Sequence, residues 1–261
     1  MSGLDVAQRH AQISEAAMDY LRSPRTAAPA LRVLGPRLGG AAVLVVGGHS
    51  LGLGGARQPL QLEVVVQDQD WDSLQVDVRS ADLSFRDAHT TPPTDLRVRS
   101  QRWLGEQLGH PEGLWLRQRA CLAQDPRGEA QQAVDQAWRS FRQGIPALVA
   151  ETYRSFRQGF EEAPLALEPL GRTVLVARAA HAALSLGLLA RGEPFPPARW
   201  LCWQVSQVVA EGEQLVVLAG RAAAQGGTDR AAYAQLRRLV DEILDGAGYG
   251  ERVVRAHAAQ A

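Results

Sequence analysis

The fold is decided by the stretch Val43-Leu-Val-Val-Gly-Gly-His-Ser-Leu-Gly-Leu-Gly-Gly55, followed six residues later by Gln61-Leu-Glu-Val-Val-Val66. An apolar, β-branched run leads into a cluster of glycines, and a second β-branched run carries one carboxylate near its start. This pattern predicts a strand, a tight turn and a partner strand. Such a unit sets backbone N–H groups beside an acid, which is the layout of a site for a phosphate and a metal ion.

The charged residues are balanced, with 28 basic and 28 acidic side chains among 261 residues. Every basic residue is arginine, because the chain contains no lysine. This composition excludes mechanisms that need a lysine, such as a Schiff base or a P-loop lysine. A net charge of zero argues against broad, salt-driven binding of nucleic acid, so no nucleic-acid partner is expected. The composition does not specify an oligomeric state.

The cysteines and the N-terminus indicate a cytoplasmic protein. Cys121 and Cys202 have neither metal-ligand spacing nor a disulfide framework, so both are expected to be buried thiols. Residues 1–22 carry charges throughout, unlike a signal peptide. The longest apolar stretch contains His181 and ends at Arg191. We therefore expect it to be a buried core helix and predict no membrane association.

The hydrophobic periodicity changes along the chain and predicts an α+β fold in two domains. A small mixed sheet with two preceding helices, 4–21 and 24–38, is expected in residues 1–98, and an all-helical bundle in residues 99–261. The predicted strands are 42–47, 61–67, 74–79 and 81–86. The predicted helices of the bundle are 100–109, 112–123, 128–143, 146–161, 165–191, 197–210, 212–225 and 229–246.

A short internal repeat lies in the helical part. Trp138-Arg-Ser-Phe-Arg-Gln-Gly144 recurs as Tyr153-Arg-Ser-Phe-Arg-Gln-Gly159. Its arginines are either a solvated surface or a basic wall that faces an anionic ligand, and the sequence leaves both open. Further along the chain, Trp200, Leu201 and Trp203 are predicted to be buried.

The glycine segment resembles the nucleotidyltransferase superfamily, which includes the aminoglycoside and lincosamide nucleotidyltransferases. The signature of that family is a strand, a Gly-Ser turn, a further glycine, Asp-x-Asp on the next strand and a third Asp on a later strand. Gly47 and Gly52 match the two glycines, whereas Gly48 stands in place of the serine. Gln61 and Glu63 occupy the Asp-x-Asp positions. Asp77 is the best match for the third acid, with Asp82 in reserve.

Two segments of the helical half extend the resemblance. Residues 182–201 are similar to a helix–turn–helix in the substrate-side bundle of the family, where an aromatic and proline-rich turn precedes a basic residue and Trp-Leu. Residues 115–125 are similar to a Trp-containing helix that ends in Asp-Pro. The resemblance thus covers most of the chain.

The resemblance implies a nucleoside triphosphate and Mg²⁺ in a cleft between the two domains, together with a small-molecule acceptor. It implies that Glu63 and Asp77 serve as catalytic metal ligands. The implied phosphate-binding residues are Gly47, Gly48, His49, Ser50, Gly52 and Arg199. Because Gln61 supplies a neutral amide and Glu63 is one methylene longer than aspartate, weak or absent Mg²⁺ binding is expected.

Three hypotheses follow for the function. The favoured one is a nucleotidyltransferase-fold protein with an eroded metal site that binds a nucleotide, another ligand or a partner, with weak or no catalysis. The alternative is an active Mg²⁺-dependent nucleotidyltransferase that modifies a small hydroxylated or amino acceptor. The third is a serine esterase that uses Ser50, because Gly48-His-Ser-Leu-Gly52 fits the Gly-x-Ser-x-Gly pattern, although that motif requires a strand–Ser–helix context.

Overall fold

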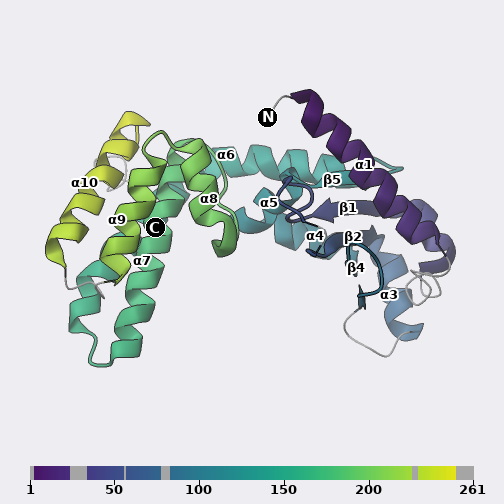
Figure 1. Ribbon diagram of the computed structural model, residues 1–261, viewed down its shortest axis with the longest axis horizontal. Helices are drawn as coiled ribbons and strands as arrows, with labels where there is room; N and C mark the ends of the chain where they lie inside the picture. Colours follow the sequence, from purple (N-terminus) through teal and green to yellow (C-terminus); the bar gives the residue numbers. More distant parts are fainter. Residues whose placement is uncertain (1–2, 24–33, 56, 78–82, 225–228, 251–261) are drawn as a thin grey trace. The chain divides into compact units, whose positions relative to one another are not determined.

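A computed structural model of the protein describes residues 3–23, 34–55, 57–77, 83–224 and 229–250 (Figure 1). The chain forms two compact units, Met1–Trp138 and Arg139–Ala261. The first contains a five-stranded mixed sheet, and the second contains helices, which confirms the predicted α+β class. The predicted boundary at residue 98 falls inside the first unit, because two helices and a fifth strand that follow it belong with the sheet.

The sheet has the strand order β3-β4-β2-β1-β5. β2 pairs with β1 in antiparallel and with β4 in parallel orientation, so it is the central strand. The two outer strands β3 and β5 pair in antiparallel orientation with β4 and β1. The strands are β1 (Ala42–Val46), β2 (Leu60–Val66), β3 (Ser84–Asp87), β4 (Thr94–Ser100) and β5 (Cys121–Gln124).

The two faces of the sheet differ in chemistry because side chains alternate along each strand. One face carries the apolar core of the first unit, which includes Val43, Leu62 and Leu96. Helix α1 (Gly3–Arg22) and helix α3 (Asp68–Asp77) contribute to this core. The other face carries polar side chains and meets α4 (Gln101–Leu108), α5 (Pro111–Gln118) and the beginning of α6 (Glu129–Glu162).

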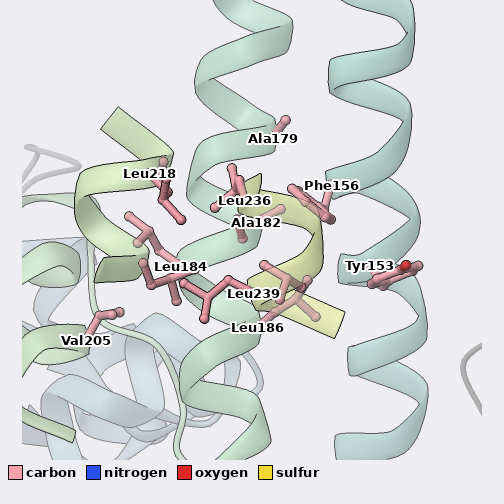
Figure 2. Close-up of a cluster of buried hydrophobic side chains, with 14 of the residues drawn as sticks. Tyr153, Phe156, Ala179, Ala182, Leu184, Leu186, Val205, Leu218, Leu236 and Leu239 are labelled. Atoms are coloured by element: carbon pink, nitrogen blue, oxygen red, sulfur yellow. The ribbon is translucent and has the colours of Figure 1, made fainter. Parts of the chain in front are cut away.

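The second unit packs its helices around one apolar cluster (Figure 2). Side chains from five helices meet there, among them Phe156, Leu186 and Leu236. The Tyr153 hydroxyl donates a hydrogen bond of 2.7 Å to Asp241 Oδ1. The elements after the start of α6 are η2 (Ala163–Leu165), α7 (Pro169–Ala190), α8 (Ala198–Val208), α9 (Gly212–Ala224) and α10 (Arg230–Gly246).

Helix α7 contains the stretch that was predicted to be a buried core helix. In the part of the chain that the structure describes, it is the one helix long and apolar enough to cross a membrane. More than half of its apolar window, 56%, is buried inside the fold. Residues 182–189 are all buried. This burial is what a central helix of a helical bundle shows.

Several of the helices and strands predicted from the sequence were wrong. Residues 74–77 end helix α3 rather than beginning a strand. The predicted helix 112–123 is found as α5 but ends at Gln118, and its last three residues begin β5. The predicted strand 81–86 is found as β3, which begins three residues later and ends one residue later than expected; residues 78–82 lie outside the described part of the chain. Most of the predicted helix 24–38 also lies outside them, and residues 35–40 form the 3₁₀ helix η1 (Gly35–Gly40). Short apolar runs fit either period, which explains these errors.

Helix α6 continues through Pro146, where a break was predicted. A proline inside a helix removes one backbone hydrogen bond. Ile145 and Val149 are buried in the core of the second unit on either side of it. Their burial offsets the lost bond and keeps the helix continuous.

The prediction for helix α8 was only partly right. Leu201 is buried, but Trp200 is half-buried, and Trp203 is 36% exposed. Cys202, predicted to be buried, is exposed. The buried stripe of this short helix runs through Leu201 and Val205, at a spacing of four residues, and Trp203 lies outside it.

We predict that Gly159→Ala destabilises the second unit. A Cβ at Gly159 would lie 2.8 Å from both Ala179 Cβ and the Leu175 carbonyl oxygen, so α7 would have to move. The expected loss in the free energy of unfolding is about 1–3 kcal/mol, measured by urea denaturation. Gly144→Ala in the same helix is the control: its Cβ would meet open space, and a gain of about 0.5–1 kcal/mol is expected. Equal effects of the two variants would contradict the close approach of α6 and α7.

Candidate functional site

The glycine turn after β1 requires glycine at two positions. Gly47 and Gly52 have φ angles of +83° and +73°, in the left-handed region that side chains with a Cβ rarely adopt. The Leu51 amide donates to the Gly47 carbonyl at 3.3 Å, and the Leu53 amide donates to the Gly48 carbonyl at 2.8 Å. The turn is therefore a compact loop held by its own backbone.

Polar side chains of α1 also pack against the backbone of the turn. A Cβ at Gly52 would overlap the Arg9 guanidinium, and His10 Nε2 lies 3.3 Å from the Ser50 carbonyl oxygen. Ser50 is buried, and its hydroxyl donates to the Gly47 carbonyl at 2.9 Å. His49 Nε2 lies 2.9 Å from the Gln58 carbonyl oxygen.

The surroundings of Ser50 do not fit a serine esterase. A nucleophile elbow places its serine between a strand and a helix, with the hydroxyl exposed. Here the turn leads from β1 into β2, which pairs antiparallel with it, and the Ser50 hydroxyl serves the turn itself. The geometry gives the esterase hypothesis no support.

The strand register collects the motif positions on the polar face. Gln61 pairs with Val46 at the end of β1, and the parallel pairing with β4 sets Gln61 opposite Asp95. Glu63 is set opposite Arg97. The neighbours Leu62 and Leu96 point into the apolar core, so these polar residues share the other face.

Glu63 is held in a buried ion pair. Arg117 Nη2, from α5, lies 2.9 Å from Glu63 Oε1, and the two side chains are only 2% and 6% exposed. Arg117 Nη1 donates to the Gly113 carbonyl at 3.1 Å. The guanidinium also lies 4.7 Å from the centre of the Trp103 ring. Glu63, at the second motif position, is thus buried beneath α4 and α5.

The electrostatics of the pair follow from this burial. Burial raises the pKa of the Glu63 carboxyl, and the positive charges of Arg117, Arg97 and Arg99 oppose that rise. Burial likewise lowers the pKa of the Arg117 guanidinium, and Glu63 opposes the fall. Each charge therefore stabilises the other, and loss of one partner would leave the second buried and unpaired.

These residues do not fit a two-metal site. Mg²⁺ binds accessible, anionic oxygen ligands. Gln61 offers a neutral amide, one oxygen of Glu63 is occupied by Arg117, and Asp95 forms an ion pair of 3.6 Å with Arg86. Within the described ranges, no three His, Cys, Asp or Glu side chains lie where they could share a metal ion.

The third acid of the motif has a better candidate than the one predicted. Asp77 ends helix α3 instead of lying on a strand, and its side chain, like all of Asp82, lies outside what the structure describes. Its role as a metal ligand stays a prediction. Asp95 lies on the strand next to β2 and on the polar face. The alternation in Thr94-Asp-Leu-Arg-Val-Arg-Ser100 was the signal that sequence reasoning missed.

Arg199, the remaining predicted ligand residue, belongs to the second unit. It is an exposed residue in the first turn of α8, and its guanidinium lies 3.8 Å from the centre of the Trp200 ring. Its contact with a phosphate, and the cleft between the domains, stay predictions.

Comparisons with known proteins yield little beyond these observations. No family model matches the chain, and no curated protein matches its sequence. A solved structure described as a nucleotidyltransferase-like protein from Exiguobacterium sibiricum aligns with 87% of this chain and 77% of its own, at 14% identity and a TM-score of 0.47. A likeness at this level carries no argument about function.

We predict that the Glu63–Arg117 pair is strongly coupled. Glu63→Leu and Arg117→Met should each lower the free energy of unfolding by about 3–5 kcal/mol, because each leaves one buried charge unpaired. The double variant should fall within about 1 kcal/mol of the parent protein, since two apolar side chains can fill the space. Urea denaturation of all four proteins measures the coupling. Additive losses in the double variant would contradict the pairing.

Proposed function

We propose that this chain is a nucleotidyltransferase-like protein that binds a nucleotide on the polar face of its sheet without a metal ion and does not transfer nucleotidyl groups. The observation that carries the proposal is the buried pair between Glu63 and Arg117. Arg117 is paired with the Glu63 carboxylate, which a catalytic metal ion would need as a ligand.

Two arginines supply positive charge on the polar face of the sheet. Arg97 is exposed and lies opposite Glu63 in the register, and Arg99 follows two residues later on the same face. Guanidinium groups bind phosphate oxygens through charge-assisted, often bidentate, hydrogen bonds. Arg97 therefore offers a triphosphate the charge that Mg²⁺ offers in a metal-dependent site.

The same substitution explains why transfer is not expected. Displacement of pyrophosphate builds negative charge on the leaving group, and divalent metal ions normally stabilise it. On this face Glu63 is buried against Arg117, Asp95 is paired with Arg86, and position 61 is an amide, so no pair of free carboxylates is left for two metal ions. The chain can bind a nucleotide there and leave it intact.

We predict ATP binding that does not depend on Mg²⁺. Isothermal titration calorimetry should give the same Kd in about 5 mM Mg²⁺ as in EDTA. Arg97→Gln should weaken binding about tenfold, the effect of losing one charge-assisted hydrogen bond. Arg22→Gln is the matched control, because Arg22 is an exposed arginine on α1, the helix that packs on the opposite face.

Two results would overturn the proposal. One is release of pyrophosphate from ATP in the presence of an aminoglycoside-like acceptor, abolished by EDTA, which would favour the active enzyme. The other is unchanged ATP binding in Arg97→Gln, which would place the nucleotide elsewhere.

A further inference from the structure

A second polar site lies at the opposite end of the central strand. Gln67 directly follows β2, and Gln101 directly follows β4. Because these strands are parallel and Val66 pairs with Ser100, the two glutamines leave the sheet side by side. Ligands of open α/β sheets bind beyond the carboxyl ends of parallel strands, which is the position of these two residues.

The side chains of both glutamines donate hydrogen bonds to the same carboxylate. The Gln67 and Gln101 amide groups donate to Glu129 Oε2, the first residue of α6, at 2.6 and 2.5 Å. A carboxylate can only accept, so both amide nitrogens must face Glu129. Their carbonyl oxygens are consequently turned to the other side, and among the described residues neither has a hydrogen-bond partner.

These groups line a cavity of about 390 Å³. That volume is in the usual range for small-molecule sites. Its apolar wall comes from small and branched side chains, such as Val65 of β2 and Leu104 of α4. Arg127 is exposed at its edge. Asp125 also lines it, but its Oδ2 already accepts a hydrogen bond of 3.0 Å from the backbone N–H of Gln131.

The cavity therefore presents acceptors and a negative charge to any ligand. Gln67, Gln101 and Glu129 line the cavity from three separate segments, and only one oxygen of Glu129 is used by the two glutamine amides. A protonated amine donates three hydrogen bonds and carries the complementary charge. We infer that this pocket binds a small organic cation, a primary ammonium group on a short carbon chain, independently of the nucleotide proposed for the other end of the sheet.

The test uses three probes with the same carbon chain. Butylammonium, butan-1-ol and butyrate are titrated into ¹⁵N-labelled protein, and the side-chain amide resonances of Gln67 and Gln101 are followed by NMR. Butylammonium should shift both resonances and bind at least tenfold more tightly than the neutral or anionic probe. Equal binding of the three probes, tighter binding of butyrate, or no shift of these resonances would overturn the inference.

Two variants test which charged side chain determines the affinity for butylammonium. Glu129→Gln keeps the shape and an acceptor but removes the charge, and should weaken butylammonium binding at least tenfold. Arg127→Ala removes the opposing positive charge at the edge and should tighten it about twofold, as expected for a screened, exposed charge. Unchanged affinity in Glu129→Gln, or weaker binding of butylammonium in Arg127→Ala, would contradict the assigned polarity. The backbone NMR spectrum of each variant reports whether it is folded.

Discussion

A carboxylate and a guanidinium buried together set the chemistry of the first unit. Arg117 comes from α5 and Glu63 from the central strand, so their contact joins the helical layer to the polar face of the sheet. Two charges removed from water must stay paired, because either one alone would cost several kcal/mol. The pair therefore fixes where α5 lies on β2 and removes Glu63 from the oxygens a metal ion could reach.

The parallel pairing of β2 with β4 organises the rest of that face. At one end it brings Gln61 and Asp95 together beside the glycine turn, and at the other it brings Gln67 and Gln101 to Glu129. Near the first end the exposed Arg97 lies two residues along β4 from Asp95, and there we propose that an anion binds. The second presents acceptors and suits a cation. One strand register thus underlies both proposed sites, which differ in polarity, on a single sheet.

Local patterns in the sequence predicted much of this fold, but they did not predict the contacts between distant segments. The glycine segment correctly predicted β1, the turn and β2, and the later helices lie largely where their periodicity placed them, apart from the break predicted before Pro146. Asp95 was missed because its strand follows a proline-rich turn, and Arg117 was missed because nothing local to residue 117 indicates a partner at residue 63. An ion pair between distant segments depends on tertiary packing, which periodicity does not encode.

The most direct test of the central claim is a titration with Mn²⁺ followed by electron paramagnetic resonance, comparing the unmodified protein with the Glu63→Leu/Arg117→Met double variant. If Arg117 has replaced the metal, the two proteins should take up Mn²⁺ equally, because Glu63 contributes no ligand. A stoichiometric Mn²⁺ site in the unmodified protein that Mg²⁺ displaces, and that the double variant lacks, would show that Glu63 binds metal and would contradict the account.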